Sequence, residues 1–275
     1  MKTTARNAAY CYGFSVVHDK VLCLFAADEP RQGAAMRKTL LWITSVLILS
    51  ISTAVQAHEC SDIALVLAVD GSDSIDDNEY AFQKAAISTA FRDKAVISTL
   101  REAGVVAVSA VFWGDAESPT QEVGWFIITD GEGAESFARE IDDDSRLVFG
   151  HTDIGNGIWS ALTMLSDSNL CPRRAIIDIS GDGRETGGLL KRPDVISLYQ
   201  ARLRAKQMDV RINALAVSDD GGDLASYYAK NVILGSDAFV MDIKNYADYS
   251  AALRKKLIRE LASKAVDVPL KASAE

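Results

Sequence analysis

The amino-acid sequence predicts an α/β fold: a doubly wound, mainly parallel sheet with helices on both faces. Two observations carry this prediction. Strand-like and helix-like segments alternate along the chain from residue 63 to residue 264, and such alternation favours a parallel sheet wrapped by helices. The strand-like segments include continuous apolar runs, such as Ile-Ala-Leu-Val-Leu-Ala-Val at 63–69, which are typical of strands buried on both faces.

Each element follows from its local pattern. The strands are expected at 63–69, 105–113, 124–129, 175–180, 210–217 and 238–241. The helices are expected at 76–101, 132–141, 154–165, 194–208, 223–230 and 245–264. The first helix starts with Asp76, Asp77 and Glu79, and acids suit the positive end of a helix dipole. No repeat or linker interrupts the series, so we expect one domain over 58–264 and a frayed tail at 265–275.

A secretory signal peptide is expected at 36–57. Met36-Arg37-Lys38 is a basic start, 40–51 is an apolar run, and Ala57 ends a segment of small residues suited to cleavage. The apolar run is too short to span a bilayer as a permanent anchor, although an uncut anchor is the alternative. We therefore expect a periplasmic or secreted protein with no stable membrane span after cleavage.

Residues 1–35 precede this complete signal and have no clear periodicity. We interpret them as a mis-assigned extension or an unusually long leader, so that translation starts at Met1 or at Met36. We assign them no structure in either case.

The chain that remains after cleavage is strongly acidic. Residues 1–57 carry 6 of the 29 Lys and Arg residues and 3 of the 38 Asp and Glu residues, which leaves 23 basic against 35 acidic residues and a net charge of −12. This charge argues against nucleic acid and anionic membrane surfaces as partners. It suits a protein that binds cations or basic partners.

Three loops rich in oxygen ligands are expected at one rim of the sheet. Asp70-Gly71-Ser72-Asp73-Ser74 follows the first strand, Gly150-His151-Thr152-Asp153 precedes a helix, and Gly181-Asp182-Gly183 follows the strand at 175–180. In an open parallel α/β sheet, ligands bind at the carboxyl ends of the strands. Alternate residues of an extended stretch point to the same side, so the D-x-S-x-S spacing aims three side chains at one point.

A divalent metal ion is the ligand that this chemistry predicts. The five side chains are Asp70, Ser72, Ser74, Thr152 and Asp182. Two carboxylates and three hydroxyls suit Mg²⁺ first, with Ca²⁺ or Mn²⁺ as alternatives, whereas the lack of thiols and clustered imidazoles disfavours zinc and copper. Taken singly, each loop has a simpler interpretation as a helix cap or a turn. The three loops together on one rim are far more specific.

The five residues resemble the metal-ion-dependent adhesion site of von Willebrand factor type A domains, whose pattern is D-x-S-x-S, then Thr, then Asp-Gly. The resemblance covers about residues 60–262 and is nearest to an uncharacterised family of bacterial exported proteins. It implies a six-stranded sheet in the order 3-2-1-4-5-6, with the third strand antiparallel. It also implies that the hydroxyls of Ser72, Ser74 and Thr152 contact the metal and that Asp70 and Asp182 hold it mainly through waters. One coordination place would be left for an acidic group on a partner.

Two positions depart from the family pattern. Gly181 stands where these domains often carry Thr, and His151 beside Thr152 is not part of the pattern. Neither change removes a ligand, but both bear on the geometry of the site.

The mature chain keeps two cysteines, Cys60 and Cys171, which suggests one disulfide in an exported protein. Cys60 lies 10 residues before Asp70, and Cys171 lies 11 before Asp182. If the two strands are neighbours, as the resemblance implies, both cysteines are level at the opposite rim. The bridge would close a loop of about 110 residues, worth roughly 4–5 kcal/mol by chain entropy. Two free buried thiols are the alternative.

Competing chemistries fit the residues less well. An EF-hand loop starting at Asp70 would need Gly and Glu where Ile75 and Ala81 stand. An aspartyl nucleophile at Asp70 usually needs a second carboxylate two residues on, where Ser72 stands. The chain has no Gly-x-Ser-x-Gly, so a serine hydrolase would lack its nucleophile elbow. His151, the only histidine in the body of the domain, is interpreted as a hydrogen-bonding neighbour rather than a base.

We therefore expect a non-enzymatic binding domain whose metal ion bridges to an exposed carboxylate on a protein or peptide partner. Trp113, directly after a strand, and His151 are candidates for the partner surface. Two alternatives stay open at this point. The same residues could serve a metal-dependent hydrolase of phosphate or ester substrates, or the metal could only tie the loops together.

Overall fold

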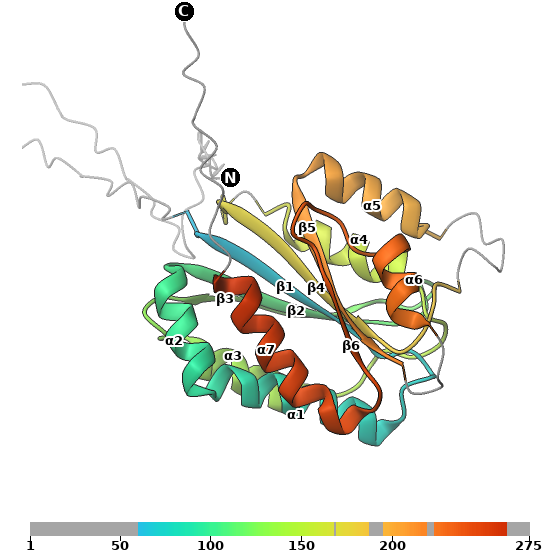
Figure 1. Ribbon diagram of the computed structural model, residues 1–275, viewed down its shortest axis with the longest axis horizontal. Coiled ribbons are helices and arrows are strands. Elements are labelled where there is room, and N and C mark those ends of the chain that lie inside the picture. The colour runs from blue at the N-terminus through green and yellow to red at the C-terminus, as the bar shows by residue number, and fades with distance from the viewer. Residues whose placement is uncertain (1–59, 168, 187–194, 219–222, 263–275) are drawn as a thin grey trace, which may run out of the picture. The chain divides into compact units, whose positions relative to one another are not determined.

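The structure is a computed structural model that describes residues 60–167, 169–186, 195–218 and 223–262. The expected extension at 1–35, the signal peptide at 36–57 and the tail at 265–275 lie outside the described residues. Within the described part, a single twisted sheet separates two layers of helices (Figure 1).

The sheet has six strands, and their arrangement confirms the fold class. They are β1 (Ile63–Asp70), β2 (Val106–Trp113), β3 (Gln121–Ile128), β4 (Arg174–Gly181), β5 (Val210–Val217) and β6 (Val240–Ile243). The strands lie in the order β3-β2-β1-β4-β5-β6. β3 pairs antiparallel with β2, and all other pairs are parallel. β1 and β2 are buried at every residue, as strands covered on both faces should be.

Helices cover both faces of the sheet. One layer holds α1 (Asp77–Arg92), α2 (Lys94–Ala103), α3 (Ala134–Asp143) and α7 (Tyr249–Ala262), which a 3₁₀ turn at Tyr246–Asp248 precedes. The other layer holds α4 (Ile154–Met164), α5 (Leu198–Gln207) and α6 (Leu224–Asn231). No helix in the described part of the chain has the length and apolar character needed to cross a membrane.

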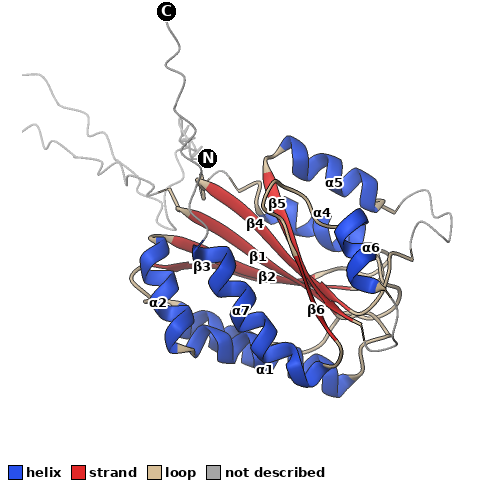
Figure 2. Cartoon of the chain, in the orientation of Figure 1, coloured by secondary structure: helices blue, strands red, loops and turns tan. Residues whose placement is uncertain are grey.

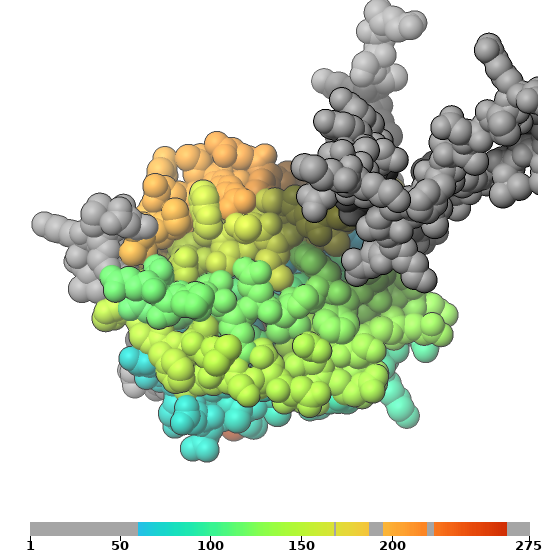
Figure 3. Space-filling view, turned by 180° about the vertical axis from the view of Figure 1, so that it is seen from behind, coloured from blue at the N-terminus to red at the C-terminus, as the bar shows by residue number. Residues whose placement is uncertain are grey.

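The two faces of the sheet carry separate apolar cores because successive residues of a strand point to opposite sides. Leu65 and Leu67 of β1 pack in the core beneath α1 and α7, whereas Val66 and Ala68 pack in the core beneath α4 and α5. The edge strand β3 has exposed positions, and Ile127 is 52% exposed. Figure 3 shows the molecule from behind, where the chain from β3 to the loop before α4, coloured green to yellow-green, occupies most of the face.

One expected helix is wrong: the segment 76–101 forms two helices, α1 and α2. Asp93 between them has an extended backbone, and its side chain accepts hydrogen bonds from the N–H groups of Ala95 and Val96. A residue that caps in this way starts a new helix, and apolar spacing alone did not reveal it. The start expected at residue 194 for the helix that is α5 lies outside the described residues.

A disulfide joins Cys60 and Cys171 at the amino ends of β1 and β4, as the sequence predicted. Their Cα atoms are 4.9 Å apart. The register pairs Ile63 of β1 with Arg174 of β4, so each cysteine lies three residues before a paired position. Because β1 and β4 are neighbours and each cysteine lies the same number of residues before the paired positions, the two sulfur atoms come together.

Candidate metal centre

The predicted ligands lie in three loops at the carboxyl end of the sheet. β1 and β4 are neighbours there, because the register pairs Val69 with Ser180. Figure 2 shows the loops, in tan, gathered at the end of the strands. The loops after β1 and β4 meet the loop before α4, and hydrogen bonds join all three.

In the first loop, Asp70 ends β1 and is fully buried. Its Oδ1 accepts a hydrogen bond of 2.9 Å from the backbone N–H of Ser72, which turns the chain away from the strand. The N–H of Ile75 donates to the carbonyl of Ser72 at 3.0 Å, and Asp76 then caps α1. The loop is therefore a short connection between β1 and α1. Ser72 within it is also fully buried.

The second loop is bound to the first at Asp73. The backbone N–H of Gly150 donates to Asp73 Oδ1 at 2.8 Å, and the N–H of Asp73 donates to the carbonyl of Gly150 at 2.8 Å. Gly150 has φ +86°, a backbone conformation that favours glycine. Two residues on, the Oγ1 of Thr152 lies 3.2 Å from the Oγ of Ser72.

The third loop reaches the first through Asp182. The hydroxyl of Ser74 donates to Asp182 Oδ1 at 2.7 Å, and the Oγ atoms of Ser74 and Ser72 are 3.1 Å apart. A Cβ added at Gly183 would lie 3.0 Å from the Oγ1 of Thr152, so glycine lets the third loop approach the second. The structure thus brings together all five predicted side chains, while their binding of a metal stays a prediction.

The structure also explains why Gly181 departs from the family pattern. A Cβ at this position would lie 2.7 Å from the hydroxyl of Tyr228 and 2.8 Å from Asp70 Oδ2. The Tyr228 hydroxyl donates to the carbonyl of Gly183 at 3.0 Å. A tyrosine from α6 therefore lies where a larger residue at 181 would have to place its side chain.

The electrostatics of the site favour a cation. Burial, and after it the negative charge of Asp182, raises the pKa of Asp70 to about 7. Asp70 Oδ2 is buried and has no hydrogen-bond partner among the described residues. An unpaired buried carboxylate oxygen is costly, and a hard divalent cation would satisfy it together with the adjacent hydroxyls. The donor set therefore fits Mg²⁺ or a similar ion.

Tyr246 has a buried hydroxyl that the sequence did not single out, and the negative charges of Asp182 and Asp70 act on it. Its OH is buried without a hydrogen-bond partner in the described structure. Burial, followed by the charge of Asp182, raises the pKa of Tyr246. It lies in the 3₁₀ turn that precedes α7. Among the described residues there is no group of three or more His, Cys, Asp or Glu that could hold a metal, so a site here depends on hydroxyls.

The two residues predicted for a partner surface have different outcomes. Trp113 is 0% exposed, and that prediction is wrong. Its ring packs so closely on α4 that a Cβ added at Gly157 would lie 2.5 Å from it. His151 is exposed, and its Nε2 lies 3.9 Å from Asp115 Oδ2.

Exposed apolar side chains near the site come instead from the segment before Gly150. Leu147 is 68% exposed and Phe149 is 48% exposed, whereas Val148 between them is buried. The alternation of an extended segment could have revealed this pattern, but the run is short and lies in no predicted element.

A comparison with known protein families identifies the family of this chain. The family described as "Protein of unknown function (DUF1194)" matches residues 59–265. The chain belongs to this family. The search among curated proteins found no match.

This DUF1194 protein has the von Willebrand factor A fold. A domain of that name from Catenulispora acidiphila is 14% identical, with a TM-score of 0.51 over 75% of this chain and 44% of that one. Proximal thread matrix protein 1 from the mussel byssus is 16% identical, with a TM-score of 0.53 over 74% of this chain and 46% of that one.

Two further structures show where the fold occurs. The mussel protein has also been solved with zinc in its MIDAS motif, at 15% identity and a TM-score of 0.52, over 74% of this chain and 46% of that one. The pilus adhesin SpaC from Lactobacillus rhamnosus GG is 12% identical, with a TM-score of 0.52 over 74% of this chain and 31% of that one. The DUF1194 chain thus spans less than half the length of each of these proteins.

Proposed function

We propose that this protein is an exported, non-enzymatic binding domain that uses a divalent cation to bind an acidic group of a partner protein. The cation would be held by Asp70, Ser72, Ser74, Thr152 and Asp182. The mature protein would consist of the domain at 58–264 after removal of a signal peptide at 36–57. The Cys60–Cys171 disulfide supports an oxidising compartment, because such bonds persist outside the cytosol.

One observation carries the proposal. Three loops far apart in the sequence place three hydroxyls and the Asp182 carboxylate in one hydrogen-bonded group, and the Asp70 carboxylate accepts from the backbone N–H of Ser72 beside it. Within that group, Asp70 Oδ2 is buried and has no hydrogen-bond partner among the described residues. Side chains that served only as helix caps would bond to nearby backbone N–H groups, whereas these hydroxyls contact one another across the loops.

The surface beside the group suits a protein ligand. Leu147 and Phe149 are exposed apolar side chains, and His151 is exposed in the same segment. A cation with a free coordination place would fix the position of a partner's carboxylate. Apolar contacts with Leu147 and Phe149 beside that carboxylate would then supply area and specificity.

Calorimetric titration tests the metal site. The domain at 58–264 is titrated with Mg²⁺, Ca²⁺, Mn²⁺ and Zn²⁺, the last because the mussel protein holds zinc in its motif. We expect binding by the wild type and its loss in Ser72→Ala, whose hydroxyl is buried at the centre of the group. Ser136→Ala, on the exposed face of α3, is the matched control. A wild type that binds none of the four ions overturns the proposal.

A second experiment separates binding from catalysis. The wild type and Ser72→Ala are used as baits in a periplasmic extract, with Mg²⁺ or with chelator. A partner captured only by the wild type, and released by chelator, supports the proposal. Turnover of generic phosphate or ester substrates that disappears in Asp70→Ala would favour a hydrolase instead. Metal binding without either result would leave the metal a structural role.

A further inference from the structure

Arg146 contacts the backbone of the loop at 71–75 at several points. Its Nη2 donates to the backbone carbonyls of Gly71, Ser72 and Ile75, at 3.1, 3.2 and 2.9 Å. Its Nη1 donates to Asp77 at 2.8 Å, at the start of α1. One guanidinium thus holds the carbonyls on both sides of the loop and the helix that follows it.

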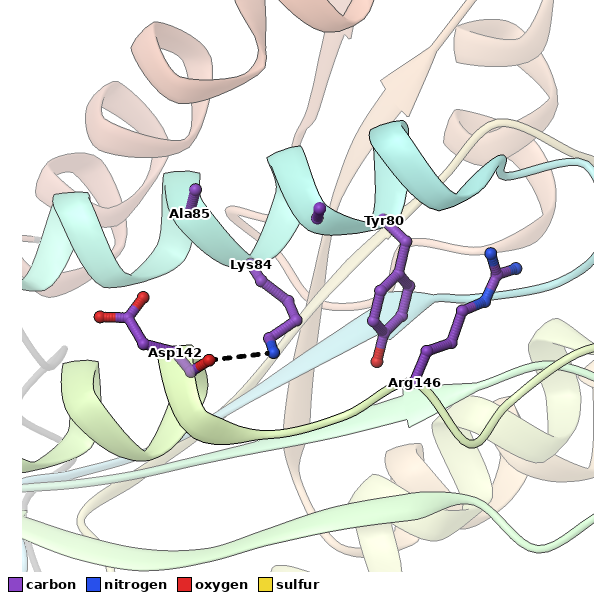
Figure 4. A pocket seen from close by; sticks show the side chains of 6 residues that line it. Tyr80, Lys84, Ala85, Asp142 and Arg146 are labelled. Carbon is purple, nitrogen blue, oxygen red and sulfur yellow. Dashed lines mark hydrogen bonds between the residues drawn. The ribbon is translucent and has the colours of Figure 1, made fainter.

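Two aromatic rings hold the guanidinium in place. Its Cζ lies 5.0 Å from the ring centre of Tyr80 and 4.7 Å from that of Phe149. Nε donates to the carbonyl of Val148 at 3.2 Å, and the side chain is only 12% exposed. Figure 4 shows the Arg146 side chain beside the Tyr80 ring, reaching from the loop after α3 toward α1. Such cation–π contacts strengthen when the cation is shielded from water.

We propose that Arg146 is the positioning residue of the candidate metal centre, and that it holds the loop at 71–75 in its binding conformation before a metal ion arrives. This inference rests on the proposed function. A flexible loop would lose conformational freedom when the cation orders it, and that loss weakens affinity. Arg146 satisfies the carbonyls of Gly71, Ser72 and Ile75 by hydrogen bonds, so the backbone that carries the hydroxyls of Ser72 and Ser74 is fixed before a cation binds.

The planar fork of arginine matters here, not its charge alone. A lysine ammonium is a point charge on a flexible stem and cannot serve three separate carbonyls and Asp77 at once. A hollow of about 240 Å³ lies next to the Arg146 stem, between α1 and the end of α3. A lysine or methionine at this position therefore meets no steric barrier, and its effect reports the lost hydrogen bonds.

Hydrogen exchange of the metal-free protein tests the inference directly. The N–H groups of Ser72, Asp73 and Ile75 are hydrogen-bonded within or next to the loop. We expect them to exchange roughly tenfold faster or more in Arg146→Lys and Arg146→Met, because local opening becomes easier. Arg139→Met, at an exposed position of α3, is the control and should leave them unchanged.

Mg²⁺ titration of the same variants gives the second readout. We expect Arg146→Lys to bind roughly tenfold more weakly or worse although it keeps the charge. If Arg146→Met does not fold, Phe149→Leu replaces it. Phe149 is half-exposed, and this substitution removes its ring contact with Arg146 but no side-chain hydrogen bond. Wild-type exchange rates and wild-type affinity in Arg146→Lys would overturn the inference. If the wild type binds no metal, the proposed function fails. The exchange rates still test whether Arg146 holds the loop: faster exchange in the variants supports that role, and unchanged exchange overturns it.

Discussion

A buried charged cluster between α7 and the strands β4 and β5 makes the stability of this protein depend on pH. Lys256 Nζ contacts Asp178 Oδ1 and lies 2.7 Å from Glu260 Oε1, and the Asn213 amide donates to the same Oε1 at 2.8 Å. All four residues are at most 2% exposed. Two carboxyl groups share one buried cation, so the cluster is nearly neutral only if one of them keeps a proton. Burial, and after it the charge of Asp178, raises the pKa of Glu260 to about 8.

The direction of the effect follows from linkage. Folded Glu260 keeps its proton up to a pH of about 8, whereas the unfolded chain releases it near 4.5. The folded state therefore binds one proton more between these values, and the stability from this group is complete below pH 4.5 and lost as pH rises to about 8. At about 1.4 kcal/mol per pH unit, the loss over the whole window is about 5 kcal/mol.

Glu260→Gln isolates this contribution. A glutamine Oε1 can accept from Lys256 and Asn213, and its amide can donate to Asp178, as the protonated carboxyl does. We expect the variant to match the wild type near pH 4.5 and to become more stable than the wild type as pH rises, by up to about 5 kcal/mol at pH 8. Urea unfolding followed by tryptophan fluorescence, from pH 4.5 to 8.5 in chelator, measures the difference.

Comparing the two proteins cancels other groups that titrate in the same range. Glu140→Gln, at an exposed position of α3, removes one carboxylate from the surface and should show a nearly constant difference from the wild type. A difference for Glu260→Gln that is equally constant, or a variant less stable than the wild type at pH 8, would refute the reasoning. Either result would mean that Glu260 is ionised in the folded protein.

Three further predictions follow from the fold. Replacing Cys60 and Cys171 together by Ser should lower the free energy of unfolding by roughly 4–5 kcal/mol, because the unfolded chain regains a loop of about 110 residues, and reductant should have no further effect on the variant. Gly157→Ala should lower it by roughly 1–3 kcal/mol by overpacking against Trp113, as thermal unfolding would show. Mg²⁺ at a hundred times its Kd should stabilise the wild type by about 2.7 kcal/mol, and Ser72→Ala should show no such shift on addition of Mg²⁺ or chelator.

The candidate site was readable from the sequence because its residues are tied to element boundaries. Asp70 directly follows an apolar run, and Asp182 comes just after the strand at 175–180, so both could be placed at the same rim from strand direction alone. The sequence shows that Gly181 departs from the family pattern but gives no reason for it. Its cause is the hydroxyl of Tyr228, which comes from a distant helix and is invisible to any local pattern.

The sequence by itself determined the alternation of strands and helices, the rim that carries the oxygen ligands, and, with the family resemblance, the strand order and the disulfide. These features depend on local periodicity and on the direction of parallel strands. Only the tertiary structure decided that Trp113 is buried, that Arg146 binds three carbonyls of the first loop, and that Lys256 and Glu260 of α7 form a buried charged cluster with Asp178 of β4. Such features depend on which side chains from remote segments share a space, and that is set by packing between elements rather than by the pattern within one.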